Sequence, residues 1–337
     1  MITIKDIAAK CGVSIATVSK ALNGQTDISE ATRLKVKAAA SELGYLPNAQ
    51  AKALKNNKTN IIGILMDDRS GNGLGHSYFA TVIECFREVV SAEGFDIMVF
   101  GRHNNDSMSY YDRCKYRNVE GVMIACADYY DSEIISLMHS NIPVVSIDYF
   151  SKRDYSVFSD SRQGIRDVVE YVYGLGHRKI ACVYGDTSQV TTIRLDTFVQ
   201  TMKQLGLTVE EDYVKQGRYG DVILAKKIAS QMIELYDPPT CIIMPDDTTA
   251  YGVFLAASDH GLKVPDDISV VGYDGLRFGQ LLYPNLVTVK QNAELVGKSA
   301  AELLIKRING ESVSEMHRQI VIETMLIKGQ SVSELTV

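Results

Sequence analysis

The chain has 337 residues, of which 46% are hydrophobic and 23% charged, and its formal net charge is −6. This length exceeds that of an ordinary single domain, and the apolar and charged fractions exclude an intrinsically disordered chain. The sequence has no run of about 18 apolar residues, so we expect neither a membrane-spanning helix nor a membrane partner. A globular protein of two or three domains is predicted.

The cysteines favour a reducing compartment. The six of them are scattered and form no Cys-x-x-Cys pair; they are Cys11, Cys85, Cys114, Cys126, Cys182 and Cys241. The first ten residues lack the basic-then-apolar pattern of a secretory signal, and no His-Glu-x-x-His or other metal spacing occurs. We therefore expect a cytoplasmic protein that uses no metal or other cofactor.

The net charge is divided unevenly along the chain. Residues 1–60 hold nine Lys and Arg against four Asp and Glu, a net charge of +5. The remainder holds 26 against 37, a net charge of −11. A basic segment ahead of an acidic body is typical of a protein whose amino-terminal part binds a polyanion.

The amino-terminal stretch predicts two short helices joined by a tight turn. Thr3 followed by Asp6 is a capping pattern that opens the first helix, and Gly12 supplies the turn. Ser14 caps a second helix over residues 15–22, which ends at an Asn-Gly pair. A third helix, capped by a serine, follows and ends at a glycine before residue 47. This arrangement is typical of a helix-turn-helix.

The second helix has two different faces. At about 100° per residue, one half is apolar enough to pack on the first helix. The other half exposes Ile15, Ala16 and Lys20, for which the sequence offers no obvious partner. Such a helix can enter the major groove, where Lys20 reaches guanine or phosphate and Ile15 and Ala16 touch thymine methyl groups. The alternative is a small helical bundle with a solvated basic face, which the charge asymmetry and the helix spacing disfavour.

The segment TIKDIAAKCGVSIATVSKALNG, followed by ISEATRLKVKAAASELGYLPNAQAKALK, resembles the DNA-binding head of the lactose-repressor (LacI/GalR) family over residues 3–58. The resemblance implies that double-stranded, pseudo-palindromic operator DNA is the partner. The residues expected to contact it are Thr3, Ser14, Ile15, Ala16, Thr17, Ser19, Lys20, Asn23, Lys52, Leu54 and Lys55.

Residues 48–59 predict a conditional hinge. Asn48 can cap about two turns of alanine-rich helix, which are marginal in water and are expected to fold on DNA. Leu54 lies between Lys52 and Lys55. In the resembled family the hinge leucine is a wedge inserted into the minor groove, and the alternative is a leucine that packs on the neighbouring domain.

From residue 60 onward, apolar runs alternate with helical stretches of roughly 12 to 18 residues. The runs are typical of buried parallel strands and comprise Ile61–Met66, Phe95–Phe100, Val119–Cys126, Pro143–Ile147, Ile180–Tyr184, Cys241–Met244 and Ile268–Tyr273. We expect two successive doubly wound lobes that separate near residues 159–161. A later segment is predicted as a strand that crosses back and a helix that returns to the first lobe, and Arg318–Leu326 is predicted as one strand spanning both lobes.

The phrases GLGHRKIACVYG, VVGYDG and PNLVTVKQN extend the family resemblance to this body, which is similar to the periplasmic sugar-binding fold. The predicted fold class is an all-α helix-turn-helix domain followed by an α/β domain of two doubly wound parallel-sheet lobes. The predicted domains are a headpiece over 1–47, a hinge over 48–59 and an effector-binding and dimerisation domain over 60–337. Its N-lobe covers about 60–160 and 291–320, and its C-lobe about 161–290 and 321–337.

Ligands of such folds bind at the carboxyl ends of the strands. The effector-binding candidates there are His76, Tyr78, Phe79, Asp148, Arg194, Tyr219, Asp246 and Asp274. Carboxylates, an arginine and aromatic faces suit a polyhydroxylated ligand. By position in the family, Arg194 and Asp274 are the strongest candidates, and Asp246 stands where the family often has asparagine. For each aspartate the alternative is a helix N-cap.

These features predict a transcription regulator, a repressor, controlled by a small-molecule effector that is a sugar or sugar derivative. A nucleobase effector and a protein corepressor remain alternatives. The tail after Lys328 has no heptad repeat, which favours a homodimer over a tetramer.

An enzyme or a sugar-binding protein fits less well. The glycine-rich GNGLGH at 71–76 lacks the third glycine of a dinucleotide fingerprint, and no Gly-x-Ser-x-Gly elbow occurs. A binding protein of the periplasmic type would have a secretory signal and lack a basic head, and this sequence meets neither condition.

Overall fold

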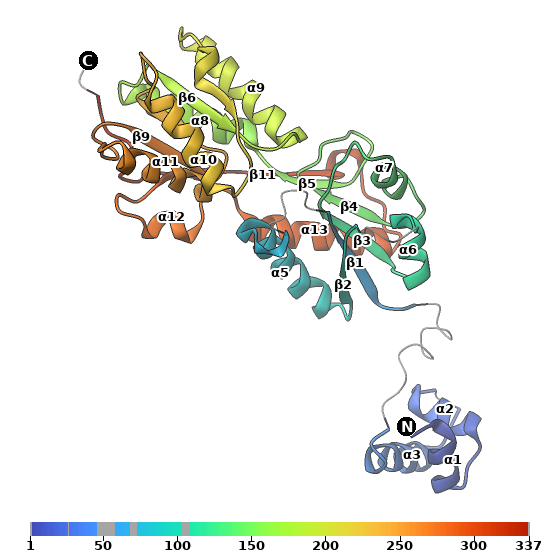
Figure 1. The fold of residues 1–337 in the computed structure, drawn as a ribbon. Coiled ribbons are helices and arrows are strands. Elements are labelled where there is room, and N and C mark those ends of the chain that lie inside the picture. The colour runs from blue at the N-terminus through green and yellow to red at the C-terminus, as the bar shows by residue number, and fades with distance from the viewer. Residues whose placement is uncertain (1, 26, 46–57, 68–72, 103–107, 336–337) are drawn as a thin grey trace. The chain divides into compact units, whose positions relative to one another are not determined.

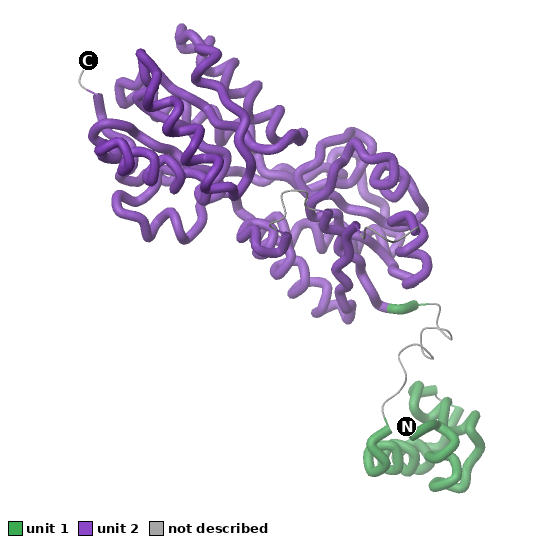
Figure 2. The backbone as a smooth tube through the Cα atoms, viewed as in Figure 1, with its two compact units in different colours: residues 1–59 green, residues 60–337 purple. Residues whose placement is uncertain are grey.

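The computed structural model describes residues 2–25, 27–45, 58–67, 73–102 and 108–335. The chain divides into two compact units, residues 1–59 and residues 60–337 (Figure 2). Most of the predicted hinge, including Lys52, Leu54 and Lys55, lies outside the described residues.

The first unit is a three-helix head. Its helices are α1 (Ile4–Cys11), α2 (Ile15–Leu22) and α3 (Glu30–Glu42). Gly12 adopts a left-handed φ of 63° that ends α1, and the Ser14 hydroxyl accepts a hydrogen bond from the Thr17 amide at 3.1 Å to begin α2. Ile7, Val18 and Val36, one from each helix, are fully buried together. The predicted second helix and its packing face are confirmed.

The second unit begins with an N-lobe built on a parallel six-stranded sheet of order β11-β5-β4-β3-β1-β2 (Figure 1). Its strands are β1 (Ile61–Met66), β2 (Asp96–Phe100), β3 (Gly121–Cys126), β4 (Val144–Ile147), β5 (Ser156–Ser159) and β11 (Gln319–Ile322). Helices α5 (Ser77–Ala92) and α13 (Ala293–Ile308) pack on one face, and α6 (Tyr110–Arg117) and α7 (Ser132–Met138) pack on the other.

The C-lobe repeats this plan with the sheet order β12-β10-β9-β8-β6-β7. Its strands are β6 (Ile180–Tyr184), β7 (Val214–Gln216), β8 (Cys241–Ile243), β9 (Ser269–Asp274), β10 (Val287–Lys290) and β12 (Met325–Ile327). Helices α8 (Ser161–Gly174) and α9 (Gln189–Gln204) cover one face, and α10 (Val222–Ile233) and α11 (Asp247–Asp259) cover the other. Short elements complete the unit: α12 (Arg277–Leu281), η1 (Gly73–Gly75), η2 (Glu211–Tyr213) and η3 (Glu315–His317).

The expected two-lobed α/β class is confirmed, with three local corrections. The segment predicted as one strand over Arg318–Leu326 is two strands, since β11 pairs parallel to β5 in the N-lobe and β12 pairs antiparallel to β10 in the C-lobe. Helices α6 and α7 have only 8 and 7 residues, shorter than predicted. Strands β5 and β7, of 4 and 3 residues, are too short to give a clear apolar run.

Three segments connect the lobes, namely the links from β5 to α8, from β10 to α13 and from β11 to β12. Two residues at strand ends have a left-handed backbone, Asp148 after β4 with φ 55° and Asp274 at the end of β9 with φ 101°. A positive φ is uncommon for any residue other than glycine and is concentrated at functional turns. The backbone conformation therefore makes Asp148 of the N-lobe and Asp274 of the C-lobe candidates for a functional site.

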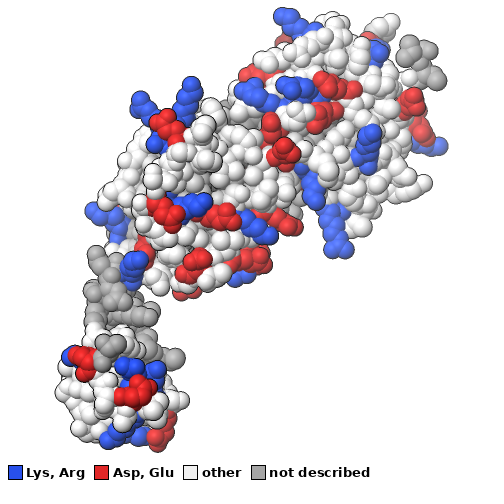
Figure 3. All heavy atoms as spheres, turned by 180° about the vertical axis from the view of Figure 1, so that it is seen from behind, with Lys and Arg blue, Asp and Glu red and all other residues white. Residues whose placement is uncertain are grey.

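The surface of the larger unit mixes both signs of charge on the face that Figure 3 shows. None of the helices in the described ranges is both long and apolar enough to cross a membrane. Within the same ranges, no three His, Cys, Asp or Glu side chains gather in a way that could hold a metal ion.

Candidate functional site

Helix α2 presents small and apolar side chains to solvent. Ile15 keeps 43% of its surface exposed, and Ala16 beside it is also exposed. Ser19 and Lys20 are half-buried on the same half of the helix. An exposed isoleucine at the start of a short helix has no role in the core of the head, so this face is free to contact a macromolecule.

Lys20 has a partner that the sequence did not reveal. Its Nζ lies 2.5 Å from Oδ2 of Asp27, which corrects the expectation of an unpartnered lysine. Asp27 follows α2 in the turn before α3, and the hydrogen bond from Lys20 holds the pKa of its carboxyl below the ordinary value. Both groups are about half exposed, so DNA can replace the carboxylate with little desolvation cost.

The other DNA-contact candidates in the head lie at the ends of the helices. The backbone amide and hydroxyl of Thr3 both donate to Asp6, each at 2.8 Å. The hydroxyls of Ser14 and Thr17 are 2.8 Å apart, and Asn23 donates to the Ser19 carbonyl at 2.6 Å. These side chains therefore define helix ends and can bind phosphate only through groups that remain exposed.

In the second unit, Arg194 is the centre of the candidate effector site. It lies on α9, retains only 9% of its surface, and stands with its guanidinium carbon 3.6 Å from the centroid of the Tyr273 ring. Its Nε donates to the Ser161 hydroxyl and one terminal nitrogen donates to the Pro245 carbonyl, both at 3.3 Å. Burial opposes its charge, but nearby Tyr273, Tyr219 and the carboxylates of Asp274 and Asp148 hold its pKa above the ordinary value.

Asp148 and Asp274, the two aspartates with positive φ, interact electrostatically with Arg194 from different lobes. Burial raises the pKa of Asp148, and Arg194 partly offsets that increase. The pKa of Asp274 is raised further by burial and by its neighbours Asp246 and Asp247, again against the effect of Arg194. The structure thus brings Arg194 and Asp274, the two strongest candidates, together with Asp148, and both aspartates lie at the carboxyl ends of strands.

Three candidates lie at the start of α5. Tyr78 is buried beside Asp148, and burial together with that carboxylate raises its pKa well above the ordinary value. His76 precedes the helix, with its ring centroid 5.3 Å from that of Phe79. Phe79 is partly buried against the N-lobe core, so much of its ring has a structural role.

Asp246 has the alternative role that the sequence left open. Its Oδ1 accepts from the Thr249 amide at 2.7 Å and caps α11, and its Oδ2 accepts from the Gly220 amide at 2.9 Å. The side chain is almost fully buried, so both oxygens are already used by the protein. Asp246 therefore fixes the loop of Tyr219, whose hydroxyl lies 2.9 Å from that of Thr191.

Several residues of the site were not singled out from the sequence. Gln291 is buried directly after β10 and donates to Asp274 Oδ1 at 2.7 Å. Near Asp274, the buried Oε1 of Gln291 has no hydrogen-bond partner among the described residues. The carboxyl-end rule would have found Gln291, Ser161 and Ser159 once β5 and β10 had been placed.

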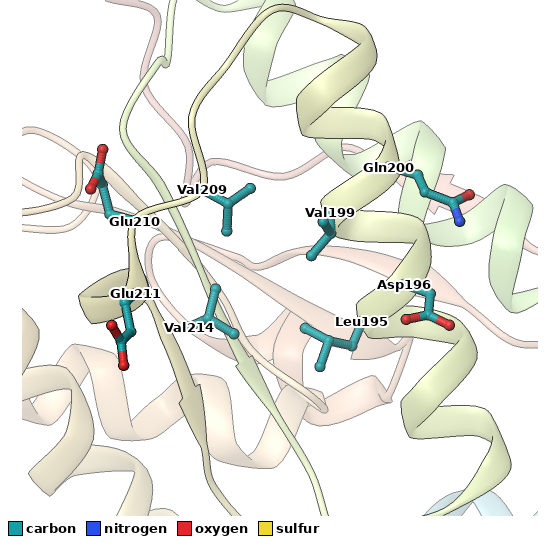
Figure 4. A pocket seen from close by; sticks show the side chains of 8 residues that line it. All are labelled: Leu195, Asp196, Val199, Gln200, Val209, Glu210, Glu211 and Val214. Carbon is teal, nitrogen blue, oxygen red and sulfur yellow. The ribbon is translucent and has the colours of Figure 1, made fainter.

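The C-lobe contains a small cavity at this site and a wider groove elsewhere. A cavity of about 20 Å³ is lined by Arg194, Tyr219 and Tyr273, which is room for about one water molecule. A wider groove of about 460 Å³ lies elsewhere on the C-lobe, between α9 and the 209–214 segment (Figure 4). Its floor is aliphatic and Asp196, Glu210 and Glu211 stand at its edges.

Comparison with known proteins decides the family. A family described as "Bacterial regulatory proteins, lacI family" matches residues 3–48, and a "Periplasmic binding protein-like domain" matches residues 169–332. An "HTH-type transcriptional repressor PurR" of Proteus mirabilis (strain HI4320) is 33% identical over 342 residues, covering 99% of this chain and 98% of the relative. The chain belongs to the lacI family. A PurR of Vibrio atlanticus (strain LGP32) is 31% identical and covers 95% of the chain.

Solved lacI-family structures agree with the fold. The lac repressor dimer, crystallised with operator and the anti-inducer ONPF, is 26% identical, with a TM-score of 0.86 and coverage of 98% of this chain and 99% of that one. As a lacI-family member, the chain is a DNA-binding transcription regulator with a small-molecule effector domain. Its relatives are repressors, so the expectation that it is not an enzyme is confirmed.

Proposed function

We propose that this lacI-family regulator is a repressor whose affinity for its operator is controlled by a small, uncharged, polyhydroxylated effector. The effector is a sugar or sugar derivative. The observation that carries the proposal is the buried Arg194, which is acted on by Asp148 from the N-lobe and Asp274 from the C-lobe. Two carboxyl groups of raised pKa beside one cation suit the hydroxyl groups of a neutral ligand, which can donate to a carboxyl oxygen and accept from the arginine.

The hydrogen-bonding groups of the site support this ligand class. Hydroxyl groups of a sugar both donate and accept, so they can satisfy the carboxylates and the arginine at once. The buried Oε1 of Gln291 lacks a partner among the described residues, and a hydroxyl group of a ligand can donate to it. Since Asp246 is already used by the protein, we assign it a supporting role.

A nucleobase is the second candidate. It is favoured by aromatic rings on both sides of the site, Phe79 on α5 of the N-lobe and Tyr219 in a loop of the C-lobe. A flat heterocycle can stack between such rings.

The DNA-binding part of the proposal rests on α2 and the hinge. The exposed Ile15 and Ala16 and the replaceable pair of Lys20 with Asp27 suit contacts with base edges and phosphates. Leu54, flanked by Lys52 and Lys55, would enter the minor groove from each of two subunits. Such a regulator acts on chromosomal DNA, so we place it in the cytoplasm.

A homodimer fits the exposed apolar side chains of the C-lobe. Helices α10, α11 and α12 and the residues after them expose Ile223, Tyr251, Phe278, Leu281 and Tyr283, with the Tyr251 and Phe278 rings 5.8 Å apart. Apolar side chains gathered in this way mark association surfaces. Two subunits would then read the two halves of a pseudo-palindromic operator.

A thermal-shift panel tests the effector class. Neutral monosaccharides and disaccharides, their phosphates, and purine and pyrimidine bases are added separately to the full chain. A ligand present at 100 times its Kd stabilises the native state by about 2.7 kcal/mol, which is readily measured. A response to neutral sugars supports the proposal, and a response confined to sugar phosphates or to bases would contradict it.

A further inference from the structure

One side chain of the C-lobe is hydrogen-bonded twice to the backbone of the N-lobe. Gln189 is the first residue of α9, and Phe150 lies in the segment after β4. The Gln189 Nε2 donates to the Phe150 carbonyl at 2.9 Å, and the Phe150 amide donates to the Gln189 Oε1 at 2.5 Å. The pair reproduces the two-bond geometry of a β-bridge with a side-chain amide in place of one strand.

The two joined segments also supply the charged groups of the effector site. Asp148 precedes Phe150 by two residues, and Arg194 follows Gln189 on the same helix. The two hydrogen bonds between Phe150 and Gln189 therefore hold the segment that carries Asp148 against the helix that carries Arg194. Arg194 itself contacts the C-lobe residues Ser161, Pro245 and Tyr273.

We propose that Gln189 is a positioning residue of the effector site, which clasps the N-lobe loop and sets how closely Asp148 approaches Arg194. This inference rests on the proposed function of that site, but the two hydrogen bonds of Gln189 are observed without an effector. A primary amide offers a donor and an acceptor side by side, which is what the carbonyl and amide of Phe150 require. Leucine has similar volume but neither group, so it would break both bonds and leave the helix intact.

The clasp biases an equilibrium between closed and open lobes. Phe150 is exposed and Gln189 is half-buried, so water can replace both hydrogen bonds when the lobes part. A closed state held by two such bonds is favoured without being locked, which lets a ligand shift the population.

Hydrogen exchange on the full chain, without effector, tests the clasp. In Gln189→Leu and Gln189→Ala we expect the Phe150 amide to exchange about tenfold faster or more, because its acceptor is gone. Small-angle scattering should report a larger mean separation of the lobes, while the melting temperature stays near that of the wild type. Gln200→Leu, an exposed position on the same helix, is the matched control and should change none of these quantities.

Three outcomes would overturn the proposal. These are unchanged exchange at Phe150 in both Gln189 variants, equal acceleration in Gln200→Leu, or a lower melting temperature with faster exchange throughout the C-lobe, which would indicate a structural role. None of them depends on which effector binds. Failure of the ligand panel and failure of the clasp are therefore distinguishable.

Discussion

The central carbon of the Arg194 guanidinium lies 3.6 Å from the centroid of the Tyr273 ring. Tyr273 lies on β9 directly before Asp274, so one strand supplies both the ring that packs against Arg194 and a carboxyl group of the site. The hydrogen bonds of Arg194 to Ser161 and Pro245 complete a support made wholly by the C-lobe. From the N-lobe, Asp148 interacts electrostatically with Arg194 and helps to raise its pKa.

Arg194→Lys tests this geometry without removing the charge. Lysine lacks the planar fork that stacks on Tyr273 and donates in several directions. We expect effector affinity to fall by about 10- to 100-fold, or about 1.4–2.8 kcal/mol, with operator binding in the absence of effector unchanged. Calorimetry with the sugar found by the panel measures the first quantity, and a gel-shift titration measures the second. Loss of operator binding alone would refute the assigned role.

Lys20→Ala tests base reading by α2. If Lys20 contacts guanine, specificity at one position in each half-site should relax by about 1–3 kcal/mol. A contact with phosphate would instead weaken binding to all sequences equally and reduce the salt dependence. Binding to a library of single-base operator variants separates these two results.

Asp27→Asn tests the pairing of Lys20 in free protein. Removing the carboxylate frees the lysine and takes a negative charge from the DNA-binding face, so the Kd for any duplex should decrease, by less than about tenfold. Measurements at two salt concentrations provide the control, because the gain should shrink as salt increases. A weaker Kd at low salt would show that Asp27 helps to order the recognition helix.

Gly185→Ala should disable the effector site and leave the fold intact. A Cβ at this position would lie 2.2 Å from the ring of Tyr219, which must then leave its place beside Thr191. We expect the thermal shift caused by the effector to disappear. Gly174→Ala is the matched control, since a Cβ there meets nothing within 4 Å. A normal effector response in Gly185→Ala would remove Tyr219 from the site.

Asp247 predicts a pH dependence of stability. Burial raises its pKa to about 7, although Thr288 and the Leu276 amide donate to it. Below pH about 4 both folded and unfolded chains hold the proton, whereas between about 4 and 7 only the folded chain does. The free energy of unfolding should therefore fall as pH rises through this window, by up to about 4 kcal/mol, and level off above pH 7.

The difference between wild type and Asp247→Asn reports the titration of this group together with the change that its removal causes in Asp274, whose pKa Asp247 raises. Urea unfolding at pH 5, 6, 7 and 8 should show the variant gaining on the wild type by about 1.4 kcal/mol per pH unit at the lower end. A constant difference across the series would mean that Asp247 does not titrate in this range.

The sequence predicts what depends on local chemistry. Ser14 and Gly12 set the ends of short helices through their own caps, so α2 is predicted to the residue. Long apolar runs such as Ile61–Met66 are also predicted correctly, because a strand buried on both faces has no polar interruptions.

Contacts between distant segments were beyond sequence reasoning. The pairing of Lys20 with Asp27 depends on the turn before α3, and the two roles of Asp246 depend on a loop 26 residues away. The split of Arg318–Leu326 into β11 and β12 arises because each half pairs with a different lobe. Gln291 lies within the phrase PNLVTVKQN, but only its place after β10 and its hydrogen bond to Asp274 reveal its role in the site.

We propose that a basic head binds operator DNA sequence-specifically under the control of a separate, two-lobed effector domain. The most direct test is the Kd of the full chain for its best duplex, selected from random DNA, against a scrambled duplex at about 0.15 M salt. We predict a preference of about 1,000-fold or more for a pseudo-palindrome, and a change in that Kd when a neutral sugar from the panel is added. Equal binding to both duplexes, with and without every member of the panel, would contradict the account.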